Sequence, residues 1–75
     1  MYTIYSKPNC SYCLQAKQLL EMEQLPFEYK QLGTHYSLDE LMTLAPNAKS
    51  FPQVFKDGVL IGGFNNLVEY LKREY

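Results

Sequence analysis

The most informative stretch of the chain runs from Tyr2 to Gln24 and has the sequence YTIYSKPNCSYCLQAKQLLEMEQ. Its first five residues, 2–6, are β-rich and predict a strand, and the Lys-Pro-Asn that follows is a turn signal. Residues 14–24 predict a helix, so Cys10 stands at the helix start and Cys13 lies one turn further in. The stretch therefore places two cysteines where a strand passes into a helix.

These two cysteines are the whole cysteine complement of the 75 residues. Two thiols at this spacing can close a small disulfide, hold half of a tetrahedral metal site, or remain inert. A helix start offers unpaired N–H groups and the positive end of the helix dipole, both of which stabilise a thiolate. The pKa of a free cysteine is about 8.5, whereas that of Cys-x-x-Cys thiols at helix starts falls to roughly 3.5–7.5. We therefore expect one reactive sulfur with a partner beside it.

The predicted helix has one apolar side, which we expect to face the core. At 100° per residue, its core-facing positions fall on an arc of about 120°, while most of its polar residues lie outside that arc. Pro26 stops the helix. The predicted core-facing residues are Tyr12, Cys13, Ala16, Leu19 and Leu20.

Two further segments continue the pattern. Residues 27–31, Phe-Glu-Tyr-Lys-Gln, alternate with period two and predict a strand parallel to the first. The segment from Ser37 to Glu40 matches a capping box and predicts a short helix that ends before Pro46.

The last third of the chain predicts a hairpin followed by a helix. The pair Asp57-Gly58 is favoured in two-residue hairpin turns, and it separates apolar runs at residues 54–56 and 59–61. Either Asn65 or Asn66 is expected to cap the final helix. Its apolar positions recur at helical spacing at Phe64, Leu67, Val68, Leu71 and Tyr75. The expected fold is α/β, with the order β-α-β-α-β-β-α and a four-stranded mixed sheet flanked by three helices.

Composition indicates one domain over residues 1–75. Hydrophobic residues make up 47% of the chain, which is typical of a globular protein rather than a disordered one. The net charge of −1 comes without a basic cluster, so a nucleic-acid partner is not expected. Residues 1–6 are too short and polar for a signal peptide, and no run is long enough to span a membrane. We expect a soluble cytoplasmic monomer without a membrane partner.

Three segments closely resemble the signature segments of the dithiol glutaredoxins, in particular the compact bacterial and phage type. They are residues 7–13, Lys-Pro-Asn-Cys-Ser-Tyr-Cys, residues 51–55, Phe-Pro-Gln-Val-Phe, and residues 61–64, Ile-Gly-Gly-Phe. The resemblance covers nearly the whole chain and implies a thioredoxin-like fold. It also implies that Cys10 is the nucleophile and Cys13 the resolving thiol.

The resemblance further implies a glutathione site. Its expected members are Lys7, Tyr12, Phe51, Pro52, Gly63, Phe64 and Asn65. In that site a lysine meets the glycyl carboxylate, and the backbone before a cis proline pairs with the ligand. The γ-glutamyl carboxylate lies at the start of the last helix.

Most of these residues also have an ordinary structural interpretation. Lys7 would then be a solvated surface lysine, Tyr12 a core aromatic, Pro52 a tolerated first residue of a strand, and Gly63 part of a tight turn. His35 has no second histidine or distant cysteine pair to form a zinc set, so we expect a solvated loop residue and no metal site.

The implied function is that of an enzyme. It is a glutathione-dependent thiol–disulfide oxidoreductase that reduces glutathione mixed disulfides and protein disulfides, such as that of ribonucleotide reductase. Glutathione is the reductant, and no organic prosthetic group is implied. Two departures from the family pattern are Ser11, where proline is usual, and Asn65-Asn66, where acids are frequent. The alternatives are a dimer that shares a [2Fe–2S] cluster and a redoxin reduced by thioredoxin reductase.

Overall fold

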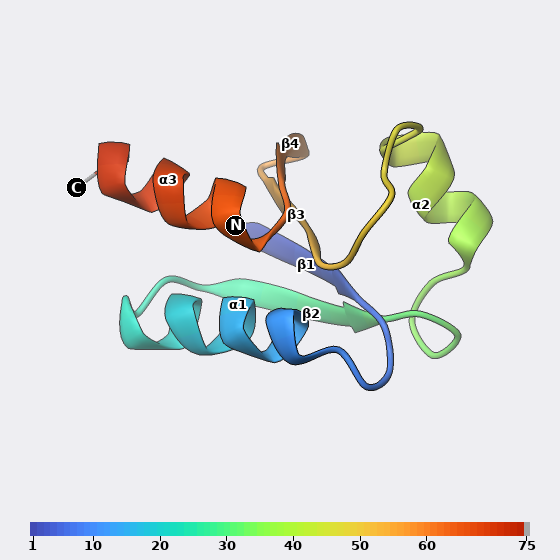
Figure 1. Ribbon diagram of the computed structural model, residues 1–75, viewed down its shortest axis with the longest axis horizontal. Coiled ribbons are helices and arrows are strands. Elements are labelled where there is room, and N and C mark those ends of the chain that lie inside the picture. The colour runs from blue at the N-terminus through green and yellow to red at the C-terminus, as the bar shows by residue number, and fades with distance from the viewer. Residues whose placement is uncertain (75) are drawn as a thin grey trace.

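A computed structural model describes residues 1–74, and Tyr75 lies outside the described residues. The elements follow the predicted order β-α-β-α-β-β-α (Figure 1). They are β1 (Tyr2–Ser6), α1 (Ser11–Met22), β2 (Phe27–Gln31), α2 (Leu38–Leu44), β3 (Gln53–Lys56), β4 (Val59–Gly62) and α3 (Phe64–Glu74).

The four strands form one mixed sheet in the order β2-β1-β3-β4. β1 pairs with β2 in parallel, as expected of two strands joined by a helix. β1 also pairs with β3 in antiparallel register, with Ile4 opposite Val54. The fold is thioredoxin-like, and the predicted four-stranded mixed sheet with three helices is confirmed.

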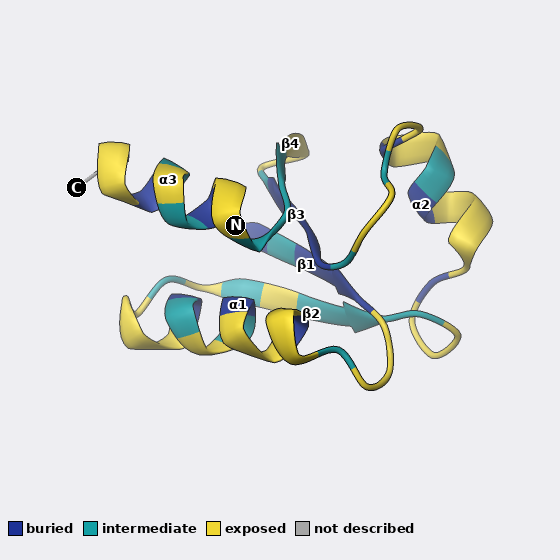
Figure 2. Cartoon of the chain, in the orientation of Figure 1, coloured by how far each residue is buried: buried dark blue, intermediate teal, exposed yellow. Residues whose placement is uncertain are grey.

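The two faces of the sheet carry separate apolar clusters. Ile4 and Val54 point to the face that α1 and α3 cover, where they pack with Leu20 and Leu67. Successive residues of a strand point to opposite faces. Tyr5 and Phe55 therefore belong to a second cluster, completed by Tyr36 and by Leu41 and Ala45 from α2 and its end. Figure 2 shows the resulting pattern, with buried positions on the inner sides of the helices and exposed ones outside.

The predicted turn and cap signals are present. Asp57 and Gly58 both have positive φ, at 51° and 82°, as a two-residue turn with both central residues left-handed requires. At the start of α2 the Ser37 side chain accepts a hydrogen bond from the Glu40 backbone, and the Glu40 side chain accepts one from the Ser37 backbone. The capping box predicted from the sequence is therefore confirmed.

Three local predictions were wrong. α1 begins at Ser11 and ends at Met22, earlier at both ends than residues 14–24, and Cys10 is its N-cap. Tyr12, predicted to face the core, is 56% exposed, because the first turn of α1 directs it toward Phe64 of α3 instead. The cap of α3 also differs, since the helix begins at Phe64, before both asparagines that were expected to cap it.

None of the helices described within residues 1–74 has the length and apolar character needed to cross a membrane.

Candidate active site at two helix starts

The two cysteines are joined in a disulfide at the start of α1, with their Cα atoms 5.3 Å apart. Cys10 is half-buried, whereas Cys13 is fully buried on the inner side of the helix. The backbone N–H of Cys13 donates a hydrogen bond to Cys10 Sγ at 3.1 Å. The sulfur of Cys10 therefore serves as the cap of the helix. This is where a negative charge on that sulfur gains from the N–H donor and the helix dipole.

Lys7 lies on the exposed loop between β1 and α1, three residues before Cys10. Its Nζ atom stands 5.5 Å from the centre of the Phe51 ring, a cation–π arrangement. This contact ties the loop that carries Cys10 to the loop that precedes β3. Lys7 thus stands at the junction of two segments of the predicted site.

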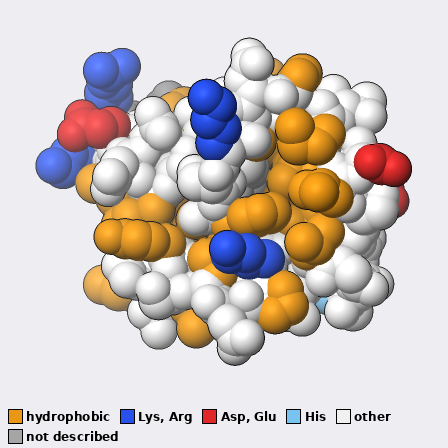
Figure 3. Space-filling view, turned by 45° about the vertical axis from the view of Figure 1, so that its right-hand side comes forward, with side chains coloured by type: hydrophobic (Ala, Val, Ile, Leu, Met, Phe, Trp, Pro, Cys, Tyr) orange, Lys and Arg blue, Asp and Glu red, His pale blue; other side chains and the backbone are white. Residues whose placement is uncertain are grey.

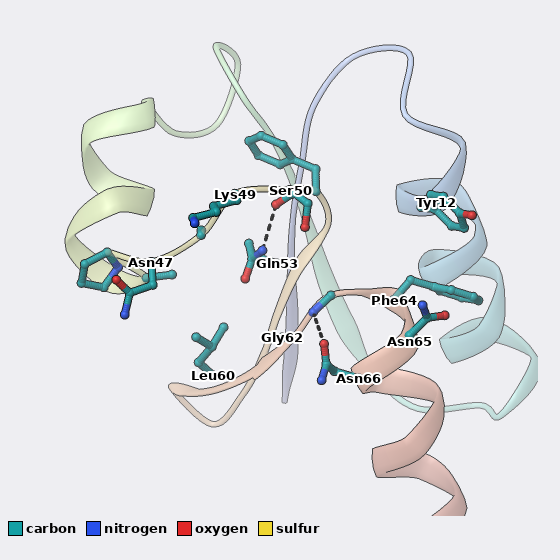
Figure 4. A pocket seen from close by; sticks show the side chains of 15 residues that line it. Tyr12, Asn47, Lys49, Ser50, Gln53, Leu60, Gly62, Phe64, Asn65 and Asn66 are labelled. Atoms are coloured by element: carbon teal, nitrogen blue, oxygen red, sulfur yellow. Dashed lines mark hydrogen bonds between the residues drawn. The ribbon is translucent and has the colours of Figure 1, made fainter.

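A cavity of 580 Å³ lies between the start of α3, the loop after α2 and the first turn of α1 (Figure 4). Its volume falls within the range of about 300–1,000 Å³ typical of small-molecule sites. Five of the seven predicted glutathione contacts line this pocket: Tyr12, Phe51, Gly63, Phe64 and Asn65. The other two flank it, since Lys7 contacts the Phe51 ring and Pro52 follows Phe51 directly.

The loop after α2 supplies lining residues that the sequence did not indicate. Asn47, Lys49 and Ser50 line the cavity from this loop, and Gln53 lines it from the first position of β3. No periodicity or motif marks these residues, because only the folding of the loop onto the sheet brings them to the cavity. Gln53 carried one signal, since it lies within the segment at residues 51–55 that resembles the family.

Gln53 fixes the shape of this loop. Its side chain is only 6% exposed, and Nε2 donates a hydrogen bond to the Ser50 carbonyl at 2.8 Å, drawn as a dashed line in Figure 4. The bond spans Phe51 and Pro52, whose peptide bond is cis, as predicted for this position. The backbone of Phe51 is therefore held from one side by a buried amide.

The start of α3 closes the other side of the pocket. The first helical bond, from the Leu67 N–H to the Gly63 carbonyl at 3.0 Å, makes Gly63 the N-cap. Asn66 lies three positions later, and its Oδ1 accepts a hydrogen bond from the Gly63 N–H at 3.1 Å. Gly62 has a φ of +128°, and a side chain there would meet Asn66 atoms at 2.7 Å. A glycine is therefore required at Gly62 for this cap to form.

The helix start also lies against the proline loop. A Cβ placed on Gly63 would come within 3.6 Å of the Pro52 carbonyl oxygen, an ordinary contact distance. At the same helix start, the rings of Tyr12 and Phe64 lie 5.8 Å apart, and this contact joins α1 to α3. The cysteine helix, the proline loop and the start of α3 are thus neighbours around one cavity.

Tyr36, in the second apolar cluster, holds the end of β1 in place through a hydrogen bond. Its hydroxyl donates a hydrogen bond to the Ser6 carbonyl at 2.6 Å, and the ring meets Tyr5 edge-on. Burial, and secondarily the neighbouring Tyr5, raise the pKa of Tyr36 to about 12. Because Ser6 directly precedes Lys7, this bond anchors the strand from which the chain reaches Cys10.

His35 has a structural contact that the sequence did not predict. Its ring is exposed, as expected, and Nδ1 accepts a hydrogen bond from the Gln31 N–H at 3.0 Å, which shapes the turn after β2. Among the side chains that the structure describes, no three or more metal-ligating groups lie together.

The fold and the site together define a dithiol redox protein of the thioredoxin-like class. A family profile described as glutaredoxin matches residues 2–61. The glutaredoxin of Enterobacteria phage T4 is 39% identical over 87 residues, which cover 96% of this chain and 100% of the phage protein.

Two other comparisons extend this picture. The hybrid peroxiredoxin hyPrx5 of Haemophilus influenzae is 37% identical over 68 residues, or 91% of this chain, but the match spans only 28% of that longer protein. The crystal structure of a buckwheat glutaredoxin–glutathione complex matches the fold with a TM-score of 0.81 at 23% identity, covering 97% of this chain and 69% of the buckwheat chain.

This chain belongs to the glutaredoxin family. It is therefore an enzyme of the thiol–disulfide oxidoreductase class, and Cys10 and Cys13 form its cysteine pair.

Proposed function

We propose that this glutaredoxin uses glutathione as its reductant and acts on glutathione mixed disulfides and on protein disulfides, such as that of ribonucleotide reductase. The observation that carries the proposal is the convergence of five predicted glutathione contacts on one cavity next to the cysteine helix. The buckwheat glutaredoxin, which shares the fold, was solved with glutathione. It supports the proposal at the level of the fold.

The cysteine geometry supports a two-step exchange. The Cys10 thiolate attacks one sulfur of a substrate disulfide, forming a mixed disulfide and expelling the other sulfur as a thiolate. The Cys13 thiolate then attacks the Cys10 sulfur, which releases the reduced product and leaves the Cys10–Cys13 disulfide seen here. Two glutathione molecules restore the dithiol and leave as glutathione disulfide.

The difference in burial matches these two roles. Cys10 is half-buried and reachable by a substrate sulfur, whereas Cys13 is fully buried and is reached only from Cys10. The N–H of Cys13 points at Cys10 Sγ, so the first turn of α1 stabilises charge on the attacking sulfur rather than on its partner.

The pocket supplies positions for the rest of glutathione. In the proposed complex, the backbone of Phe51 pairs with the cysteinyl residue of the ligand in a short strand-addition mode. Lys7 meets the glycyl carboxylate, and the γ-glutamyl carboxylate lies at the start of α3, by Gly63 and Asn65. Tyr12 and Phe64 then flank the ligand as an aromatic rim.

The proposed enzyme works as a monomer in the cytoplasm, where the glutathione pool keeps thiols reduced. Sizing of the purified protein in reducing buffer tests the monomer. A stable dimer in the absence of iron would contradict this part of the proposal.

The test of the function is turnover of a glutathione mixed disulfide with glutathione, glutathione reductase and NADPH. We expect steady NADPH consumption that depends on both the protein and glutathione. A parallel assay replaces glutathione and its reductase with thioredoxin reductase. Turnover in the second assay only would overturn glutathione dependence and identify a redoxin reduced by thioredoxin reductase.

A further inference from the structure

The pocket beside the first turn of α1 has a one-sided set of charges. Among the described residues that line it there is no aspartate or glutamate, and its one charged side chain is Lys49. Lys7 adds a second cation through its contact with the lining residue Phe51. On the face of the molecule shown in Figure 3, the acidic side chains lie at the margins, whereas basic side chains lie both at one margin and in the middle among apolar ones. The pocket thus favours anionic groups.

Glutathione, the ligand of the proposed function, does not have only anionic groups. It carries a carboxylate at each end and an ammonium beside the γ-glutamyl carboxylate. The first turn of a helix offers N–H donors and a positive dipole, which stabilise a carboxylate and oppose an ammonium. An ammonium at the start of α3 therefore needs a nearby acceptor of its own to be recognised.

The side chains at this helix start supply no strong acceptor. Oδ1 of Asn66 accepts the N–H of Gly63 at 3.1 Å, so one of the two lone pairs of this neutral oxygen is used in the cap. Asn65 is exposed at the rim, where a neutral amide competes with water for an ammonium. Neither amide carries the charge that would make the ammonium contact worth more than its hydration.

We propose that this pocket recognises the carboxylates of its thiol ligand and does not select for the ammonium. Its substrate class then includes γ-linked thiols that lack the α-amine. The inference rests on the proposed function, because it concerns the same pocket. It adds that the amine of the ligand contributes little to recognition by this chain.

The test uses the first half of the reaction with Cys13→Ser protein, which stops at the mixed disulfide. The substrates are disulfides between one fluorescent cysteine peptide and three thiols. The thiols are glutathione, glutaryl-Cys-Gly, which lacks only the ammonium, and γ-aminobutyryl-Cys-Gly, which lacks only the γ-glutamyl carboxylate. The Cys10 thiolate attacks the thiol-ligand sulfur, a new disulfide forms as the old one breaks, and the peptide leaves as a thiolate. No other reactant is needed.

Stopped-flow rates at low substrate concentration give the apparent second-order rate constant for each substrate. We expect the glutathione and glutaryl-Cys-Gly disulfides to react within about threefold of each other, since an uncharged, exposed contact contributes little. The γ-aminobutyryl disulfide should react at least about tenfold more slowly, because it loses the interaction with the helix start. A preference for glutathione over glutaryl-Cys-Gly above threefold overturns the inference, as does an undiminished rate with the γ-aminobutyryl disulfide.

A variant that adds a carboxylate at the start of α3 tests where the ammonium of the ligand lies. In the same Cys13→Ser background, Asn65→Asp should raise the preference for glutathione over glutaryl-Cys-Gly by roughly three- to fivefold, the size of an exposed ion pair. The matched control is Asn47→Asp, which adds the same charge on the opposite side of the same pocket (Figure 4) and should leave that preference unchanged.

The outcomes separate the two claims. If none of the three disulfides reacts, the proposed function fails. If the glutathione disulfide reacts and the glutaryl disulfide lags beyond threefold, only the ammonium inference fails. An unchanged preference in Asn65→Asp would also overturn it, because the ammonium would then lie away from the start of α3.

Discussion

α1 and α3 cover the same face of the sheet, and their first turns meet at one cavity, but they begin differently. At the start of α1, the cap is the sulfur of Cys10, which accepts the Cys13 N–H. At the start of α3, the cap is completed from inside the helix, where the Asn66 amide accepts the Gly63 N–H. The first helix thus directs a donor at the sulfur of its own cap, while the second completes its cap with a side chain from its own first turn, which in the proposed complex leaves first-turn donors for a ligand carboxylate.

One physical property can serve two purposes at these helix starts. Unpaired N–H groups and the helix dipole stabilise negative charge at either start. Where the charge is a cysteine thiolate, the result is a nucleophile, and where it is a ligand carboxylate, the result is a binding site. The aromatic pair of Tyr12 and Phe64 joins the two starts, so in the proposed complex the ligand sulfur at α1 and the ligand carboxylate at α3 belong to one molecule.

The largest expected effect comes from removing the sulfur at the start of α1. Cys10→Ser should lower turnover of glutathione mixed disulfides and of protein disulfides by more than about a thousandfold, because the attacking thiolate is removed. Cys13→Ser should retain turnover of glutathione mixed disulfides, because glutathione replaces the resolving thiol, and should lose most turnover of protein disulfides. Steady-state assays of both variants on both substrates test this. Equal losses on the glutathione substrate would remove the distinction between the two cysteines.

The next effect concerns the strand that leads to α1. The pKa of Tyr36 is raised from 10.0 to about 12, so the fold favours the neutral phenol. The neutral Tyr36 phenol therefore contributes to the free energy of unfolding. This contribution is fully present below pH 10 and is lost as the pH rises toward 12. From the size of the shift it amounts to roughly 2–3 kcal/mol. In the wild type, we expect the free energy of unfolding measured in urea to fall between about pH 10 and pH 12.

Tyr36→Phe should remove that alkaline step and also lower the free energy of unfolding at pH 7 by about 1–2 kcal/mol, since the buried Ser6 carbonyl loses its hydroxyl donor. The control Tyr12→Phe changes an exposed phenol and should retain the step. An identical alkaline profile in Tyr36→Phe and the wild type would contradict the assignment.

A smaller effect is expected at the start of α3. Asn66→Ala removes the side chain that accepts the Gly63 N–H and should lower the free energy of unfolding by about 1 kcal/mol. The matched change Asn65→Ala, at the exposed neighbouring amide, should stay within about 0.5 kcal/mol of the wild type. Chemical denaturation of the three proteins measures this, and equal stability of the two variants would show that the cap at Asn66 contributes nothing.

The smallest effect concerns the cation beside α1. Lys7→Gln removes a positive charge from the loop that carries Cys10 and should weaken glutathione binding by roughly two- to fivefold, as expected for an exposed charge. The matched control is Lys17→Gln on α1, which also removes a lysine that contacts an aromatic ring, in this case Tyr29 at 5.3 Å. We expect glutathione kinetics to change only in Lys7→Gln. A similar change in both variants would indicate a general effect of net charge.

Much of the fold was predictable because its signals are local. The capping box at Ser37 and the turn at Asp57-Gly58 depend on a few neighbouring residues, and both are present as predicted. The parallel pairing of β1 and β2 follows from the short helix that joins them. The cysteine pair at a helix start was visible for the same reason.

The errors fall where one element meets another. Tyr12 satisfied the apolar arc of α1, but its turn lies beside α3, and so it packs on Phe64 at the surface. The cap of α3 was misassigned because Gly63 is the N-cap and Asn66, at the third helical position, accepts the Gly63 N–H with its side chain. The place of Lys49 in the pocket depends on how the loop after α2 folds back, which no local pattern reveals, and Gln53 was marked only by its position in the segment at residues 51–55.

The most direct test of this account is the pKa of the Cys10 thiol in the reduced protein. It is followed by the ultraviolet absorbance of the thiolate in Cys13→Ser, where Cys10 is the one remaining cysteine. If the start of α1 stabilises the thiolate, the pKa will lie in the range of roughly 3.5–7.5 found for thiols at such positions. A pKa near 8.5, the value of an unperturbed cysteine, would contradict the claim that this helix start activates Cys10.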